Sequence, residues 1–238
     1  KNNFVYANVP YEIKDYESIY KDPKNTIDFN FELSEKIEKD RLNEGADGAI
    51  LKNYQGSIHE VNFIEKILTT ILAKLSNFIP GAGIWMNTQR PEWNDANNAL
   101  VGNGVSMVTL YYLRRFLNFF ITILKNDDSS SFEISTELYH FFEKLNISFC
   151  KIDSNISNKD RKKFVDDIGE VAAEYRDRIY KSYFSGTKEL VDVDRLINFL
   201  ETAQKLLEKT IESNKREDGL YHAYNPVSYT HLTLPTNC

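Results

Sequence analysis

The spacing of apolar residues predicts five helices after residue 56. Four stretches repeat apolar positions at intervals of three and four, as in helices with one buried face: 57–79, 130–145, 157–186 and 192–214. In a fifth, 104–125, apolar residues occupy nearly every face, which predicts a helix enclosed by other elements. The spacing of a serine three residues before a glutamate resembles a capping box at two starts, Ser57 with Glu60 and Ser130 with Glu133.

These helices are joined by short turns, and no pair of strands stands out between them. The pattern therefore predicts an all-α region over residues 57–226, built of antiparallel helical hairpins. Residues 1–56 show no sustained period, and we expect an irregular segment that packs on the helical domain. Within it, 3–10 favours a short strand and 31–42 a short helix.

A polar and aromatic segment, residues 84–104, interrupts the helical pattern. It holds both tryptophans, an arginine, two acids and several asparagines, with no helical or strand-like period. A polar loop between two apolar helices is where a scaffold usually displays binding or catalytic groups. Indole rings stack on the apolar faces of sugars, and arginine, asparagine and carboxylate groups bind hydroxyls. The segment therefore predicts a carbohydrate site.

Composition narrows the classes of partner and compartment. The net charge of −6, with acids and bases interspersed, argues against a nucleic-acid binder and leaves no polybasic patch for a membrane. The apolar run 105–124 reaches bilayer length, but Arg114 and Arg115 lie in its middle, so we expect a buried helix and no membrane partner. Only two cysteines are present, which excludes a disulfide framework and a thiolate zinc site and favours a reducing, cytoplasmic location.

Histidines and carboxylates are not spaced as metal ligands. His59 near a helix start is expected to be solvated or to act in capping, and His140 stands alone on an aromatic face. The turn at residues 44–48 lacks the oxygen spacing of a calcium loop. We therefore predict no metal and no organic cofactor.

Both ends of the sequence look atypical. The chain starts at Lys1 without a leader, so we expect its N-terminus to be internal to a longer protein. Residues 227–238 carry no charge, and 228–236 resemble a translated sequencing adapter. We expect this tail to be non-native, with the natural reading frame lost near Pro226.

The stretch Glu92-Trp-Asn-Asp-Ala-Asn-Asn98 resembles the Asp-Trp-Asn-Asp segment of cellobiose and chitobiose phosphorylases and their six-hairpin, (α/α)6-barrel glycosidase relatives. The longer phrase over 89–102 is similar to large bacterial proteins of this class. The resemblance implies that 57–226 is part of an (α/α)6 toroid, that Asp95 is the general acid, and that Trp93 shapes a sugar subsite. It also implies an oligosaccharide substrate and inorganic phosphate as a co-substrate.

The sequence departs from the family pattern, and alternatives stay open. Glu92 replaces the usual first aspartate, Ala96 and Asn97 replace a small-residue and glycine continuation, and no phosphate-binding residues can be located. Phosphorolysis of a β-linked oligosaccharide is expected, with inverting hydrolysis or a non-catalytic carbohydrate-binding or scaffold domain as alternatives. Asp95 has a second interpretation as a helix N-cap.

The remaining candidate residues surround the proposed acid. Trp85 and Trp93 are expected to be sugar platforms. Four residues are expected to make polar contacts with the substrate: Arg90, Glu92, Asn94 and Asn98. Glu92 is too close to Asp95 to act as the opposing base of an inverting pair. A second polar and aromatic stretch, 218–225, contains Tyr221 and His222 and is either a simple turn or a rim that contacts sugar.

Overall fold

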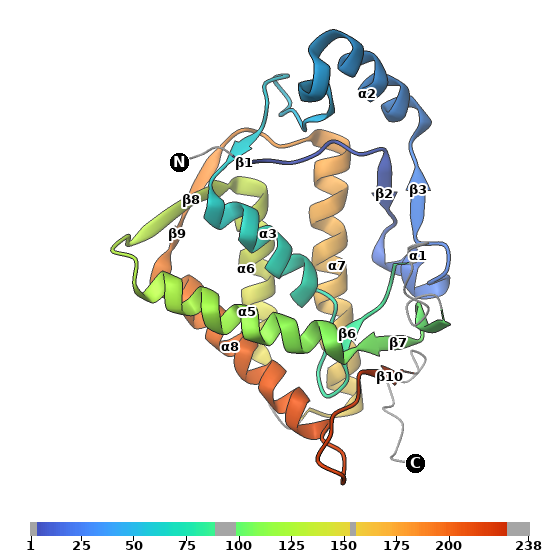
Figure 1. Cartoon of the computed structure of the whole chain (residues 1–238), viewed down its shortest axis with the longest axis vertical. Coiled ribbons are helices and arrows are strands. Elements are labelled where there is room, and N and C mark those ends of the chain that lie inside the picture. Colours follow the sequence, from blue (N-terminus) through green and yellow to red (C-terminus); the bar gives the residue numbers. More distant parts are fainter. Residues whose placement is uncertain (1–3, 89–98, 153–155, 228–238) are drawn as a thin grey trace.

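The computed structural model describes residues 4–88, 99–152 and 156–227, in which helices and short strands alternate (Figure 1). Five helices form the body of the protein: α3 (Phe63–Leu75), α5 (Met107–Lys125), α6 (Thr136–Lys151), α7 (Asn158–Ser182) and α8 (Val193–Ser213). Two further helices, α1 (Tyr16–Lys21) and α2 (Phe31–Glu44), and the 3-10 helix Gly45–Ala49 belong to the N-terminal part.

The described residues also contain four small antiparallel sheets, so the expected all-α fold is wrong and the fold is mixed α and β. Three sheets have two strands each: β1 (Phe4–Val5) with β4 (Glu60–Val61), β2 (Tyr11–Ile13) with β3 (Ile27–Phe29), and β8 (Ser131–Ser135) with β9 (Lys188–Asp192). The fourth has the order β10-β7-β6-β5, from β5 (Phe78–Ile79), β6 (Gly83–Trp85), β7 (Gly104–Ser106) and β10 (Tyr224–Pro226). An (α/α)6 toroid is built of helical hairpins alone, and this arrangement does not match it.

The strands were missed because they are short and adjoin helices. Phe78 and Ile79 continue the apolar spacing of α3, although the helix ends at Leu75 and they form β5. Both predicted capping boxes are also wrong. The N-cap of α3 is Asn62, whose side chain accepts the Glu65 backbone N–H, and residues 131–135 form β8 before α6 starts.

Other helix predictions are confirmed. Ser157 is the N-cap of α7, with its side chain accepting the Asp160 backbone N–H. Asp192 caps α8, whose bounds match the predicted 192–214 closely. Helix α2 covers the predicted 31–42. Long amphipathic periods were therefore sufficient to locate these helices.

The main helices enclose one apolar core. In Figure 1, α5 and α8 run side by side across the lower part, α6 stands more steeply behind α3, and α7 packs on α6 and stands to the right of α3. Aromatic rings occupy the centre, where Phe149 packs edge to face on Phe164 and Phe199, with ring centres 5.3 and 5.6 Å apart. This core fixes the ends of the helices, at which the sheets and polar clusters lie.

Helix α5 is long and apolar enough to cross a membrane by length and composition, a test that core helices of soluble proteins also pass. One face of α5 packs on α8, where Arg114 binds Glu208 at 2.8 Å. This half-exposed pair gives the Arg114 guanidinium a charged partner on α8. The opposite face exposes a row of large apolar side chains: Tyr112, Phe116, Phe119 and Ile123. The absence of a membrane partner stays a prediction.

Candidate functional site

The four-stranded sheet holds both ends of the polar segment 84–104. β6 leads into the segment and β7 leads out of it, and the two strands pair antiparallel with Trp85 opposite Val105. Beyond the strands, the Met86 N–H donates to the Gly104 carbonyl at 3.1 Å and the Gly102 N–H donates to the Met86 carbonyl at 2.7 Å. All residues of β5, β6 and β7 are buried. The polar segment therefore starts and ends on a rigid, buried base.

Strand β10 reinforces this base from far along the sequence. It pairs with β7, and the Val227 N–H donates to the Asn103 carbonyl at 2.8 Å. Val227 is buried, although the prediction placed it at the start of the non-native tail. The packed chain thus extends to Val227, and residues 228–238 lie outside the described residues.

Trp85 belongs to the core, so its expected role as an exposed sugar platform does not fit the structure. Only 4% of the residue is exposed. Its indole N–H donates to the Gly102 carbonyl at 3.1 Å, and its ring meets Tyr16 edge to face at 6.4 Å. Trp85 instead ties the two ends of the polar segment together.

The other residues predicted within this segment lie outside the described residues: Arg90, Glu92, Trp93, Asn94, Asp95 and Asn98. Their roles as acid, sugar platform and polar contacts stay predictions, and so does the N-cap interpretation of Asp95.

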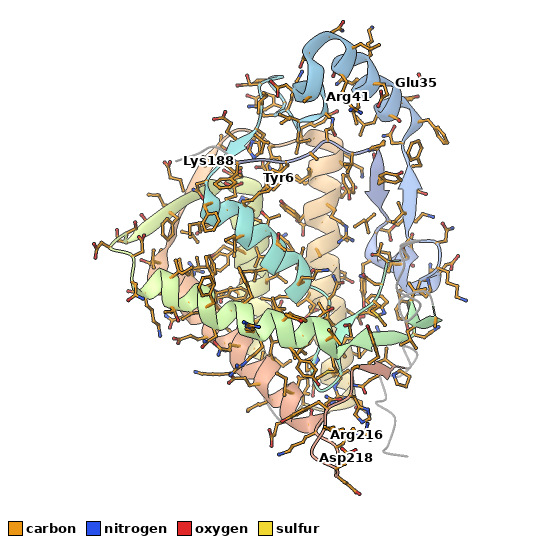
Figure 2. All side chains as sticks on the ribbon, viewed as in Figure 1. Tyr6, Glu35, Arg41, Lys188, Arg216 and Asp218 are labelled. Atoms are coloured by element: carbon orange, nitrogen blue, oxygen red, sulfur yellow. The ribbon has the colours of Figure 1, made fainter. Side chains whose placement is uncertain are left out.

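Tyr221 and His222 lie in a turn at the opposite end of β7. Pro226 pairs with Gly104, at the end of β7 where the polar segment leaves the sheet, whereas Tyr224 pairs with Ser106. The turn before β10 therefore projects from the other end of the sheet, and Figure 2 labels its Arg216 and Asp218 at the lower tip. The His222 carbonyl accepts the Tyr111 hydroxyl at 2.9 Å. The structure does not bring this turn to the base of the polar segment.

A buried polar cluster, which the sequence analysis missed, joins α3 to the β8–β9 sheet. Glu65, on the first turn of α3, is fully buried and accepts the Ser135 N–H and the Lys188 ammonium, each at 3.0 Å. The Ser135 hydroxyl lies 3.0 Å from the same ammonium and 3.1 Å from His59 Nε2, and it donates to Glu65. Figure 2 labels Lys188 near Tyr6, whose ring stacks on His59. We call these four residues, His59, Glu65, Ser135 and Lys188, the Glu65 cluster.

The groups of the Glu65 cluster bind one another. Burial alone would raise the pKa of Glu65, but the nearby His59 ring, the hydrogen bonds from Ser135 and the charge of Lys188 outweigh it and lower the pKa. Ser135 is fully buried and donates its proton to Glu65, so its oxygen is not placed to attack a substrate. The cluster therefore has a structural role and joins α3 to the β8–β9 sheet.

His59 shows how far the sequence interpretation of this cluster was wrong. The predicted solvated or capping histidine is 3% exposed and stacks on Phe184 with ring centres 4.0 Å apart. A signal was nevertheless present in the sequence, because Glu65 lies at helical spacing with the buried residues Leu68, Leu72 and Leu75. An acid on a buried helix face needs partners, and these come from distant parts of the chain.

No three potential ligand side chains (His, Cys, Asp or Glu) converge in the part of the chain that the structure describes.

Two comparisons with known proteins bear on the candidate site. The sequence matches no protein-family model, and no curated protein resembles it closely enough to count as a relative. The role of the polar segment therefore rests on its residues and on its base.

Gly102 gives a test of that base. Its φ of +81° lies in the left-handed region, and a Cβ there would approach Cβ and Cγ of Pro23 at 2.2 and 2.3 Å. We expect Gly102→Ala to lower the free energy of unfolding by about 2–4 kcal/mol, from backbone strain and overpacking together. Urea denaturation measures this loss.

Gly219 provides the matched control for Gly102. Its φ is +80°, but a Cβ would meet no atom within 4 Å. Gly219→Ala should therefore cost only about 1 kcal/mol, from the backbone alone. Equal losses in the two variants would contradict the close packing of Gly102 on Pro23.

Proposed function

We propose that this protein acts on carbohydrates and cleaves glycosidic bonds by an inverting route, through the polar segment 84–104. The observation that carries the proposal is the base of this segment, whose two ends are fixed on a buried four-stranded sheet. A polar and aromatic excursion on a rigid base is the usual way in which proteins position reactive groups. The resemblance of residues 92–98 to the phosphorylase segment supplies the chemistry.

Asp95 is the proposed general acid, which protonates the oxygen of the leaving sugar. An inverting reaction needs this protonated carboxyl on one side of the bond and a nucleophile on the other. In phosphorolysis the nucleophile is inorganic phosphate, and its oxygen bonds to the anomeric carbon as the glycosidic bond breaks. The products are a sugar 1-phosphate of inverted configuration and a free sugar that carries the proton from Asp95.

The neighbouring residues of the segment bind and orient the sugar in this proposal. The indole of Trp93 offers an apolar face to a pyranose ring. Arg90, Asn94 and Asn98 bind hydroxyls, and Glu92 either binds a hydroxyl or, as a like charge, raises the pKa of Asp95.

The test is an assay of the full-length natural protein on β-linked disaccharides, with and without inorganic phosphate. We expect release of an α-sugar 1-phosphate only when phosphate is present. Release of free sugar without phosphate would select inverting hydrolysis by the same segment. Saccharide binding without any turnover would contradict a catalytic role and leave a carbohydrate-binding domain.

A further inference from the structure

A groove between α6 and α7 contains a buried carboxylate that is incompletely paired. Two hollows of about 290 and 460 Å³ share Glu137, on the first turn of α6, and Arg178, near the end of α7. The first hollow follows the two helices, with Phe141 and Tyr175 stacked 4.7 Å apart among its walls. The second lies at the turn after α7, beside Tyr54 and Ser185. We call the two hollows together the Glu137 groove.

Glu137 is held in place at one oxygen only. Its side chain is 1% exposed, and Oε1 accepts the Ser185 N–H at 3.0 Å. The nearest cation, Nη2 of Arg178, lies 3.9 Å from Oε1, too far for a hydrogen bond. Oε2 is buried and has no hydrogen-bond partner in the described part of the chain. An unpaired oxygen of this kind is unfavourable unless a ligand supplies a donor.

Arg178 has the complementary capacity. Its side chain is 53% exposed and makes no hydrogen bond to any residue that the structure describes. The other charged pair of the groove is satisfied internally, because Lys144 binds both oxygens of Glu174 at 2.5 Å. The positive and negative charges that line the groove therefore balance. One acceptor, Oε2 of Glu137, and the N–H donors of the Arg178 guanidinium are left without hydrogen bonds among the described residues.

We propose that the Glu137 groove binds a saccharide through two neighbouring hydroxyl groups. One hydroxyl donates to Oε2 of Glu137, and the hydroxyl oxygens accept from the Arg178 guanidinium. The last torsion of a glutamate side chain is soft, so the carboxylate can turn Oε2 toward the groove without moving α6. Oε1 turns with it, which loosens the bond from the Ser185 N–H, and the bond from the ligand hydroxyl offsets this loss. A lining with balanced charges favours an uncharged ligand, and the exposed ring of Tyr54 offers an apolar face.

The Glu137 groove is separate from the base of the polar segment on the four-stranded sheet. Phe164 of α7 packs on Phe78 of the four-stranded sheet, with ring centres 6.5 Å apart, and Arg178 lies fourteen residues further along the same helix, about 20 Å away at the helical rise. The choice of a saccharide as ligand rests on the proposed function. The existence of a site rests only on Glu137, Arg178 and the hollows.

The test is a titration of the ¹⁵N-labelled full chain with D-glucose and, separately, with glycine as a zwitterionic probe. We expect millimolar D-glucose to shift the amide signals of Tyr54 and Ser185, and glycine to leave them unchanged. Glu137→Gln should weaken D-glucose binding about tenfold, since it replaces a charged acceptor. Glu201→Gln, on α8 outside the groove, and Asp95→Asn, in the polar segment, should leave unchanged the affinity that is read from the Tyr54 and Ser185 signals.

Each other outcome contradicts a defined part of the proposal. Glycine binding that depends on Glu137 would overturn the saccharide class, and the absence of shifts with both probes would overturn the site. If Glu137→Gln does not fold, Arg178→Lys is used in its place, because the Arg178 side chain is half exposed. Unchanged D-glucose affinity in Arg178→Lys would also overturn the site. Asp95→Asn distinguishes the two proposals, because it should greatly slow glycoside cleavage and leave D-glucose binding in the Glu137 groove intact.

Discussion

Asparagine in place of Asp95 is expected to lower kcat for glycoside cleavage by about 10²- to 10⁴-fold, the usual contribution of a general acid. The amide has nearly the shape of the carboxyl group but cannot give a proton to the leaving oxygen. KM should change little, because the proposed sugar contacts of Trp93 and Arg90 would remain. Steady-state kinetics of the full-length protein, with circular dichroism to check folding, measures the effect.

A control variant and a second substrate separate the acid from a structural role of Asp95. Asp128→Asn removes an exposed acid in the turn after α5 and should leave kcat unchanged. An aryl glycoside whose phenol leaves without protonation should restore most of the rate in Asp95→Asn. An equal loss on both substrates would favour the N-cap interpretation, and an unaffected kcat would exclude Asp95 as the acid.

The largest expected effect on stability is that of Glu65→Ala. We expect the free energy of unfolding to fall by about 3–5 kcal/mol, because Lys188 and Ser135 lose their anionic partner in the core. Glu174→Ala, which breaks the exposed pair with Lys144, should cost less than about 1 kcal/mol. Urea denaturation of the two variants measures the difference, and similar losses would contradict a stabilising role for the Glu65 cluster.

The pKa of Glu65 sets the pH dependence of this stabilisation. In the folded protein the pKa lies below its usual 4.5, because the hydrogen bonds and the Lys188 charge outweigh the effect of burial. The contribution of the ionised carboxylate is therefore complete above the unfolded-state pKa and is lost as the pH falls through the folded-state value. The stability difference between the wild type and Glu65→Gln should shrink as the solution is acidified, and a constant difference would contradict this assignment.

The sequence was sufficient to locate the long helices but not to locate the strands. Amphipathic stripes and single N-cap residues, such as Ser157 and Asp192, act within a few residues, so local pattern located α7 and α8. Strands of two to five residues, such as β5 and β8, are defined by partners elsewhere in the chain. The apolar residues of β5 extended the helical period, and the spacing of Ser130 and Glu133 gave β8 the look of a helix start, so the all-α prediction followed.

The candidate sites also differ in whether local sequence pattern was sufficient to predict them. The polar segment was found because its composition breaks the pattern around it. Trp85 was misassigned because the sequence does not show that its indole N–H reaches the Gly102 carbonyl or that its ring meets Tyr16. Glu137 gave no local signal, since its partners Arg178 and Ser185 come from the end of α7 and the following turn.

The position of β10 has a consequence for how the protein is made. Ser106 is paired with Tyr224, a residue synthesised more than a hundred positions later. While the ribosome is still adding these residues, one edge of β7 lacks its neighbour, and such edges recruit other chains. Nascent chains should therefore depend on chaperones until Val227 has left the exit tunnel, and chains released early should aggregate.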